Sequence, residues 1–416
     1  MRVLLSTIGT RGDVQPLVAV ALTLRAAGHG ARLCVPEDYC DWIQRLGFPA
    51  TPIAPVPWRA SAPGARPDLS PERVQAAIAG QFDVLLAAAR DCDVLVSAAV
   101  LPPARSVTEL LGIGYAFAAI CPVMLPSPYH PPIAPPTADQ ERPNDTAVNT
   151  ELWARLAESQ NARLGPALNR CRESAGLDSV DDVFSHVMTS RPWLSADPVL
   201  GPWPDPAGGT ALQTGAWVAR DDRPLPGDLE AFLRAGESPV YVGFGSMPME
   251  AGLAEVILAA ARQAGRRAII ASGRAGLALA SREPDCLVIG DVNTRTLFGQ
   301  VAAVVHHGGA GTTAAAGLAG VPQVVVPQRF DQPYWARRVR DLGIGIAHPS
   351  GTPTADSLAD ALGHALTPGV AARARSVSGA MTKDGAQVAV GHLLTIPVPE
   401  RRRQELREPS INSMID

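Results

Sequence analysis

Residues 301–319, VAAVVHHGGAGTTAAAGLA, join an apolar run to a helix of small residues through a turn rich in histidine and glycine. The run at 301–306 is typical of a buried strand, and residues 311–319 are typical of a helix. Glycine lets a backbone approach a ligand closely, and the free N–H groups at a helix start attract an anion. The stretch therefore predicts a strand–turn–helix unit that can cradle a diphosphate. The alternative is a tight strand–helix turn around buried imidazoles.

The same alternation of strand and helix extends to both sides of this stretch. In the second half of the chain, strands are predicted at 240–244, 267–271, 287–289, 301–306 and 323–327, with helices at 250–264 and 311–319. In the first half, strands are predicted at 2–7, 31–35 and 93–97, with helices at 16–27, 39–46 and 74–89. This rhythm predicts an α/β fold with two parallel sheets, whose carboxyl ends face each other across a cleft.

Two proline-rich segments interrupt the alternation. Residues 122–136, PVMLPSPYHPPIAPP, predict a surface loop because proline is excluded from helix interiors and central strands. Residues 198–227 are rich in Pro, Gly and Asp and separate the two periodic halves, with a short strand at 211–214. The predicted division of the chain is a first domain at 1–205, a linker at 206–227, a second domain at 228–385, a helix at 386–400 that packs back on the first domain, and a disordered tail at 401–416.

Composition limits the classes of protein to which the chain can belong. A length of 416 residues suits two domains, and a net charge of -4 gives no reason to expect nucleic acid as a partner. The apolar run at 3–5 is too short for a signal peptide, and no stretch has the length of a membrane span. The six cysteines are scattered without metal-like spacing. We therefore expect a cytoplasmic monomer, without membrane insertion and without a metal site at the Asp91-Cys92-Asp93 triplet.

A second polar motif, Phe330-Asp331-Gln332-Pro333, follows the predicted strand at 323–327. A carboxylate beside an amide offers acceptors and donors for vicinal sugar hydroxyls. The alternative is that Asp331 caps a helix begun by Pro333. A Rossmann dehydrogenase is a poorer match, because the first loop reads Gly9-Thr10-Arg11-Gly12-Asp13, without GxGxxG and with an acid where a pyrophosphate would lie.

Taken in order, these motifs resemble a known family. RGDVQP at 11–16, GFGSM at 243–247, DVN at 291–293, HHGGAGTT and FDQP are similar to the family 1 inverting glycosyltransferases of GT-B fold. Their fold has two Rossmann-like parallel-sheet domains that face each other across a deep cleft. Longer strings, PVMLPSPYHPP at 122–132, TSRPWLSADPVL at 189–200 and DQPYWARRVRDLGIGIAH at 331–348, resemble the glycopeptide-antibiotic (vancomycin-type) enzymes.

The resemblance implies an acceptor-binding first domain, a nucleotide-sugar-binding second domain, and a role for each motif residue. Asp13 falls on the catalytic base, although it could also cap the helix that follows. Val292 is expected to contact the nucleotide base through its backbone, and Asp331 and Gln332 to bind sugar hydroxyls. His130 is a candidate acceptor contact. The residues expected at the donor diphosphate are Thr10, Ser246, His307, Gly309, Gly311 and Thr312.

The implied reaction is inverting transfer of a hexose or deoxy(amino)sugar from a UDP- or dTDP-linked donor to a natural-product hydroxyl, without a metal or other cofactor. The expected acceptor is a glycopeptide aglycone; the alternatives are a polyketide, macrolide or sterol acceptor. An alternative of another class is a non-catalytic nucleotide-binding partner of a sister transferase. The sequence departs from the family at residues 272–276, Ser-Gly-Arg-Ala-Gly, where an Arg-Gly-Trp string is expected.

Overall fold

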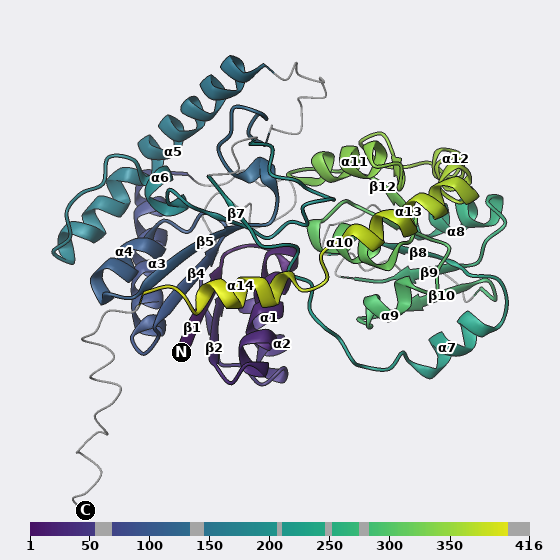
Figure 1. Ribbon diagram of the computed structural model, residues 1–416, viewed down its shortest axis with the longest axis horizontal. Coiled ribbons are helices and arrows are strands. Elements are labelled where there is room, and N and C mark those ends of the chain that lie inside the picture. The colour runs from purple at the N-terminus through teal and green to yellow at the C-terminus, as the bar shows by residue number, and fades with distance from the viewer. Residues whose placement is uncertain (55–68, 134–144, 206–209, 246–251, 274–282, 398–416) are drawn as a thin grey trace, which may run out of the picture.

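The structure, a computed structural model, describes residues 1–54, 69–133, 145–205, 210–245, 252–273 and 283–397. Two lobes lie side by side, and the chain runs from the first lobe into the second (Figure 1). Each lobe is built on one sheet, and the strand pairs in both sheets are parallel. The predicted pair of parallel sheets is therefore confirmed.

The first sheet has the strand order β3-β2-β1-β4-β5-β6-β7, and the second has the order β10-β9-β8-β11-β12-β13. The strands of the first sheet are β1 (Arg2–Thr7), β2 (Gly30–Val35), β3 (Ala50–Pro52), β4 (Val94–Ala98), β5 (Gly114–Ala119), β6 (Trp193–Leu194) and β7 (Leu212–Gln213). Those of the second are β8 (Val240–Gly243), β9 (Ala268–Ala271), β10 (Cys286–Ile289), β11 (Ala303–His306), β12 (Gln323–Val325) and β13 (Gly345–Ala347).

Helices connect these strands. In the first lobe they are α1 (Arg11–Ala26), α2 (Cys40–Arg45), α3 (Pro71–Ala89), α4 (Pro103–Leu111), α5 (Thr146–Ser174) and α6 (Val183–Met188). After the linker come α7 (Gly227–Arg234), α8 (Leu253–Gln263), α9 (Thr294–Phe298), α10 (Ala310–Ala319), α11 (Gln332–Asp341), α12 (Ala355–Ala365), α13 (Pro368–Ala380) and α14 (Gly385–Leu393).

The central strands are continuous apolar runs because helices cover both faces of each sheet. Val3, Leu4 and Leu5 of β1 are fully buried, as are Val304 and Val305 of β11. Both strands lie where the order of strands reverses: β1 between β2 and β4, and β11 beside β8. Ligands of open α/β sheets bind at the carboxyl ends of strands at such points. The fold therefore puts the loops after β1 and β11 at the two positions best suited to a site.

The lobes are in direct contact. One hydrophobic cluster contains Cys121 and Leu200 from the first lobe together with Trp335 and Val339 from α11. α1 of the first lobe also contacts α10 of the second. The loops after β1 and β11 therefore lie on facing sides of the junction.

The last described helix, α14, returns to the first lobe and packs on α1 (Figure 1). Ala389, Val390 and Leu393 are buried there, in one cluster with Leu17. The helix expected at 386–400 thus contacts the first lobe, whereas the tail expected at 401–416 lies outside the described residues. The chain crosses between the lobes twice. The two crossings lie side by side, because a Cβ on Gly215 would lie 3.1 Å from the Gly385 Cα.

One prediction about local structure is wrong and another is confirmed in part. The helix expected at 16–27 begins at Arg11 and contains Pro16. The segment expected to be a surface loop at 122–136 is a loop where it is described, apart from the short 3-10 turn Pro122–Met124. Pro126 and Pro128 are exposed, but Leu125 is fully buried and packs in one cluster with Trp153 of α5, so the loop is only partly at the surface.

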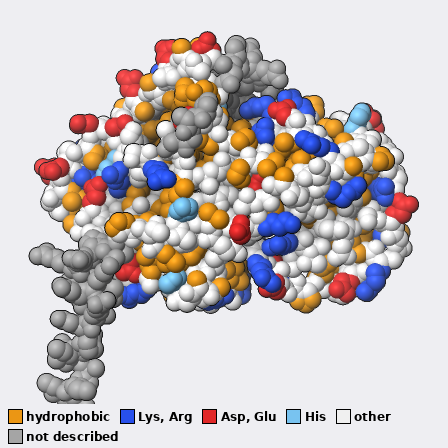
Figure 2. Space-filling view, viewed as in Figure 1, with side chains coloured by type: hydrophobic (Ala, Val, Ile, Leu, Met, Phe, Trp, Pro, Cys, Tyr) orange, Lys and Arg blue, Asp and Glu red, His pale blue; other side chains and the backbone are white. Residues whose placement is uncertain are grey.

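The surface carries charges of both signs. On the face that Figure 2 shows, basic and acidic side chains are interspersed on both lobes, in keeping with the small net charge. Among the described residues, no helix combines the length and the apolar character that crossing a membrane requires.

Candidate active site

The loop after β1 brings Asp13 to the junction. Thr10 is the N-cap of α1, so Asp13 is the third residue of the helix and not its cap. The Asp13 Oδ2 atom accepts hydrogen bonds from the Thr10 backbone N at 2.6 Å and from the Thr10 hydroxyl at 3.1 Å. A side chain that reaches back to the N-cap N–H is half of a capping box. The contact holds the carboxylate at the start of α1. The Thr10 hydroxyl, a predicted diphosphate contact, donates to Asp13 here.

Gly9 makes room for this carboxylate. A Cβ built on Gly9 would lie 2.1 Å from the Asp13 Oδ2, far inside van der Waals contact. One turn further on, a Cβ on Gly12 would meet nothing closer than the Thr10 hydroxyl at 3.6 Å. The glycine at position 9 is therefore required by the position of Asp13, whereas the glycine at 12 is not.

Arg11 connects the same helical turn to the second lobe. Its Nη2 atom donates to the Asp291 Oδ1 at 2.6 Å, and its guanidinium lies over the Trp42 ring, 4.7 Å from the ring centroid. Asp291 belongs to the DVN motif after β10 and also accepts from Arg223 at 3.4 Å. The DVN motif and the loop after β1 are thereby joined across the junction.

The two histidines after β11 have different environments. His306 is fully buried: its Nδ1 accepts from the Gly308 N at 3.1 Å, and its Nε2 lies 2.9 Å from the Gln323 Oε1. Burial lowers the pKa of His306 to about 3, so the imidazole is neutral and shapes the turn. The alternative of a buried imidazole that holds a tight turn therefore applies to His306.

The His307 ring packs beside Gly245, which follows β8, and Gly309, the N-cap of α10. A Cβ on Gly245 would lie 3.2 Å from its Cε1, and one on Gly309 would lie 2.7 Å from its Nε2. Burial lowers the pKa of His307 to about 4. Its Nδ1 is buried without a hydrogen-bond partner among the described residues. Such a group is one that a ligand can satisfy.

Besides the His307 ring, the start of α10 offers backbone N–H groups as donors. Gly309 is the N-cap, and the first bond inside the helix runs from the Thr313 N to the Gly309 O at 3.0 Å. The N–H groups of residues 310–312 therefore have no partner within the helix and carry its positive dipole end. Gly311 is exposed, and a Cβ there would meet nothing within 4 Å. The Thr313 hydroxyl bonds back to the Gly309 carbonyl at 2.9 Å, which leaves Thr312 as the hydroxyl of the pair for a ligand.

Asp331 lies at the start of α11. It occupies the N-cap position, but its side chain makes no capping bond; its Oδ2 accepts from the Trp335 indole N–H at 2.8 Å. Burial raises the pKa of Asp331 to about 6, with a further rise from the charge of Asp13 and a partial offset from Trp335. The carboxylates of the two lobes are thus close enough to affect each other.

The other predicted site residues are placed less simply. The Gln332 Oε1 accepts from the N–H groups of Gln328 and Arg329, at 2.8 and 3.0 Å, so this oxygen closes the turn before α11. Val292 is half-buried against the core of the second lobe. Ser246 and residues 274–276 of the altered string lie outside the described residues.

His130 lies within the first lobe. Its ring meets Trp153 and Trp203 edge-on, with centroids 5.9 and 6.0 Å away, and none of its described contacts joins it to Asp13 or His307. Next to Trp203 is a cavity of about 130 Å³, lined mainly by Leu125, Pro126, Phe184, Met188, Pro192 and Trp203.

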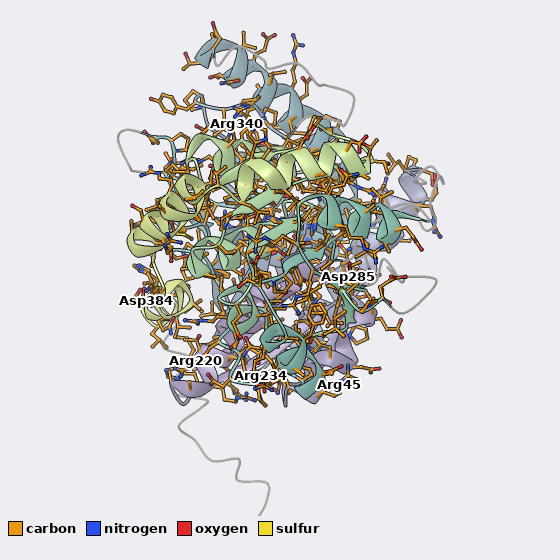
Figure 3. All side chains as sticks on the ribbon, turned by 90° about the vertical axis from the view of Figure 1, so that its right-hand side faces the viewer. Arg45, Arg220, Arg234, Asp285, Arg340 and Asp384 are labelled. Atoms are coloured by element: carbon orange, nitrogen blue, oxygen red, sulfur yellow. The ribbon has the colours of Figure 1, made fainter. Side chains whose placement is uncertain are left out.

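A larger cavity lies beside α7. It measures about 500 Å³ and is lined by charged and amide side chains, including Asp221, Arg223 and Arg234. Figure 3 looks onto the second lobe and shows Arg220 and Arg234 at the end of the molecule away from Arg340 of α11. This cavity is therefore separate from the Arg340 end of α11.

The chain matches two family models. Residues 3–121 match the glycosyltransferase family 28 N-terminal domain, and residues 255–388 match the erythromycin biosynthesis protein CIII-like C-terminal domain. Each model matches part of one lobe, and they follow each other in chain order.

Curated relatives match nearly the whole chain. The vancomycin aglycone glucosyltransferase of Amycolatopsis orientalis is 46% identical over 388 residues, which are 92% of this chain and 94% of that protein. The dTDP-epi-vancosaminyltransferase of the same organism is 42% identical over 387 residues, 91% and 93% of the two chains.

Solved structures share the fold. The glycotransferase of kitacinnamycin superposes with a TM-score of 0.68 at 20% identity, over 96% of this chain and 98% of that one. Glycosyltransferase VinC in complex with dTDP gives a TM-score of 0.64 at 20% identity, over 97% and 100%. The two parallel-sheet lobes are therefore a GT-B fold.

Proposed function

Because the chain belongs to the glycopeptide-type glycosyltransferases of family 1, we propose that it transfers a hexose or deoxy(amino)sugar to a glycopeptide-antibiotic aglycone with inversion at the anomeric carbon. The donor is a UDP- or dTDP-linked sugar. One observation carries the proposal: the Asp13 carboxylate, held by two Thr10 donors, lies in the first turn of α1, the helix that contacts α10 across the junction of the lobes.

The proposed step is a single displacement. An acceptor hydroxyl oxygen attacks the anomeric carbon while the Asp13 carboxylate takes the hydroxyl proton. The bond from the anomeric carbon to the phosphate oxygen breaks, and its electron pair leaves with the nucleoside diphosphate. Because the attack comes from the face opposite the leaving group, the anomeric configuration inverts. The two donors of Thr10 support this role, since they fix the orientation of the carboxylate.

The leaving diphosphate gains negative charge as the bond breaks. The N–H groups at the start of α10 and its dipole oppose that charge, and the close approach at Gly309 and Gly311 lets the phosphates reach them. His307 and Thr312 add donors, and Ser246 is expected to add another. These groups supply the stabilisation that a divalent cation gives elsewhere. We expect transfer to persist in excess EDTA.

The remaining contacts of the proposal concern the sugar, the base and the acceptor. Asp331 accepts from sugar hydroxyls, and Gln332 contributes through the rest of its amide, since its oxygen already closes a turn. Val292 contacts the nucleotide base, and His130 stays a candidate acceptor contact. Among acceptors, the glycopeptide is favoured over a polyketide or sterol by the two Amycolatopsis orientalis relatives, which are named for vancomycin aglycone and epi-vancosamine.

The proposal includes a monomer in the cytoplasm. All six cysteines are free thiols, as expected for a protein of a reducing compartment. Burial raises the pKa of Cys34 to about 12 and that of Cys286 to about 11, so both are protonated and inert. Size-exclusion chromatography with light scattering tests the oligomeric state.

The test is a matrix of donors and acceptors read by mass spectrometry. The purified protein is incubated with UDP-glucose or dTDP-glucose and with vancomycin aglycone, a macrolide aglycone or a sterol. We expect a hexose adduct on the glycopeptide, with an anomeric coupling in the NMR spectrum opposite to that of the donor. Adducts only on the other acceptors, or retention of configuration, would contradict the proposal.

Variants of Asp13 test whether the protein is an enzyme or a non-catalytic nucleotide-binding partner. Asp13→Asn should lower kcat by about 10²–10⁴-fold and leave UDP or dTDP binding by isothermal titration nearly unchanged. Asp41→Asn, at an exposed carboxylate of α2, is the control. If the protein binds nucleotide but forms no product with any pair, the non-catalytic alternative replaces this proposal.

A further inference from the structure

Trp335 joins the proposed sugar-binding carboxylate to the packing of the other lobe. Its side chain is only 2% exposed, and its indole N–H donates to the Asp331 Oδ2 at 2.8 Å, one helical turn earlier. The bond determines which way the carboxylate points, because it occupies one of the two oxygens. It also replaces the capping bond that an aspartate at an N-cap usually makes.

The six-membered edge of the indole faces the first lobe. A Cβ on Gly201 would lie 2.8 Å from the Trp335 Cη2 and 2.9 Å from its Cζ3. Arg338, three residues along α11, donates to the carbonyls of Leu200 at 2.8 Å and Val199 at 3.1 Å. Segment 197–201 of the first lobe therefore forms the surface on which this face of α11 rests.

Asp197 holds that segment in place. It is fully buried, and its Oδ1 accepts from the N–H groups of Val199 and Leu200 at 2.8 and 3.0 Å. Its Oδ2 accepts from the Thr382 N at 2.7 Å, close to the second crossing between the lobes. Residues 197–201 of the first lobe thus fix the position of the Trp335 ring, while the indole N–H bonds to Asp331 of the second lobe.

We propose that Trp335 is a positioning residue: it orients the Asp331 carboxylate for the donor sugar and transmits the packing of residues 197–201 to it. The inference rests on the proposed contact between Asp331 and the sugar. Trp335 itself does not take part in the displacement.

The groups around Asp331 define what the indole bond does to its charge. Asp13 from α1 carries the charge that acts on Asp331, and it disfavours a second negative charge. Cys121 at the end of β5 is a neutral neighbour, because burial holds its thiol pKa well above the usual range. Tyr334 of α11 is also neutral, since burial raises its pKa. The Trp335 N–H therefore favours the ionised form of Asp331 against burial and Asp13.

The first experiment is a double-mutant cycle on Trp335→Phe and Asp331→Ala. Phenylalanine keeps an apolar ring and loses the N–H. Using UDP-glucose or dTDP-glucose, whichever the unmodified protein turns over, we expect Trp335→Phe to raise the donor KM about fivefold to tenfold. In the Asp331→Ala background the same change should alter the donor KM less than about twofold, because the partner is already gone.

The second readout is the pH profile of kcat/KM for the donor. Loss of the N–H raises the pKa of Asp331 further, so the acidic limb of the profile should move to higher pH in Trp335→Phe. A lower fraction of folded enzyme would reduce kcat without changing the donor KM, and the folded fraction is measured at each pH of the profile and divided out. The profile therefore remains informative even if the variant is less stable.

Two further variants complete the design. Trp217→Phe is the matched control: Trp217 is 4% exposed and donates to the Thr214 hydroxyl at 2.9 Å, within the first lobe. It should leave donor KM and the acidic limb unchanged. Gly201→Ala pushes on the Trp335 ring from the other lobe and should raise donor KM in the same direction, about twofold to fivefold.

Three outcomes would overturn the inference. One is an unchanged donor KM in Trp335→Phe together with a raised donor KM in Asp331→Ala. That result would contradict the role of Trp335 but not the proposed contact between Asp331 and the sugar. Another is additivity of the two changes in the cycle. The last is an unchanged donor KM in Asp331→Ala itself, which would remove the proposed sugar contact and the inference together.

Discussion

Arg11 and Asp291 form an ion pair across the junction of the lobes, with 2.6 Å between the Arg11 Nη2 and the Asp291 Oδ1. Arg11 lies two residues before Asp13, in the same first turn of α1, and Asp291 lies beside Val292. The side chains are 37% and 49% exposed, so screening by water and salt limits the pair to at most about 1 kcal/mol. The pair joins the start of α1 to the DVN motif, which is proposed to bind the nucleotide base.

Arg11→Ala should therefore raise the donor KM about threefold to fivefold with little change in melting temperature. The effect should shrink in 0.5 M NaCl, because the unmodified protein loses the same interaction to screening. Steady-state kinetics at two salt concentrations check this. Arg32→Ala, which removes a longer 3.7 Å pair with Asp91 inside the first lobe, is the control. A loss in Arg11→Ala that is equal at both salt concentrations would exclude an electrostatic cause.

Gly9→Ala should abolish most transfer. The new methyl group cannot share space with the Asp13 carboxylate, which must leave its two Thr10 donors. We expect kcat to fall by about 10²-fold or more, while UDP or dTDP binding by calorimetry is retained. Gly12→Ala, with its nearest neighbour at 3.6 Å, should keep nearly full activity. Equal losses in the two variants would mean that helix disruption, and not the displacement of Asp13, is responsible.

Alanine variants of Gly308 and Gly311 should distinguish an effect on folding stability from an effect on ligand binding. Gly308 has φ +91°, and a Cβ there would lie 2.8 Å from the Val325 Cγ1, so Gly308→Ala should cost about 1–3 kcal/mol of unfolding free energy. Gly311→Ala should leave stability unchanged or slightly higher, because nothing lies within 4 Å of its Cβ. Its methyl group should nevertheless weaken UDP binding, since the phosphates are proposed to rest on this glycine. Urea unfolding measures the change in stability, and calorimetry measures the change in UDP binding. If Gly311→Ala binds UDP as tightly as the unmodified protein, the diphosphate does not bind at this glycine.

Asp331→Asn should stabilise the fold at neutral pH. The Asp331 carboxyl has a pKa of about 6 against an ordinary 3.8, so between these values the folded protein binds more protons than the unfolded chain. The contribution of Asp331 to the stability of the unmodified protein therefore falls as pH rises from about 4 to about 7. The neutral amide escapes this loss and still accepts from Trp335.

The expected gain for Asp331→Asn is about 1–2 kcal/mol at pH 7.5, after allowance for partial exposure, and it should vanish near pH 4. Urea unfolding at both pH values measures it. Asp41→Asn, at an exposed carboxylate, should show no such pH dependence. A gain of equal size at both pH values would argue against a raised pKa.

The central strands of both sheets could be predicted because a strand buried on both faces is a continuous apolar run, as at 3–5 and 303–305. The start of α1 could not be predicted from Pro16, which normally marks a first turn. The better signal was Thr10 followed three residues later by Asp13, a variant of the capping box. α5, at 146–174, gave no clear signal because its sequence is mostly polar and includes Pro166.

The candidate site residues were predicted from sequence motifs, since a glycine turn and a helix start are local features. Trp335 could have been suspected from its spacing of four residues after Asp331 on one helix. The contact of Trp335 with Gly201 and the ion pair of Arg11 with Asp291 could not be predicted from the sequence, because they depend on how the two lobes pack together. The bonds that the Gln332 oxygen accepts from the preceding turn were not foreseen either, and its role in sugar binding stays a prediction.

The return of α14 to the first lobe determines how this chain can be recombined with relatives that use other donors. A hybrid that takes its second half from another transferase must keep residues 385–393 from the parent that supplies α1, or it will lose the apolar cover of that helix. The two crossings meet where Gly215 adjoins Gly385, so both splice points fall at one place in space. Sugar specificity should therefore be exchangeable as a single cassette bounded by these two glycines.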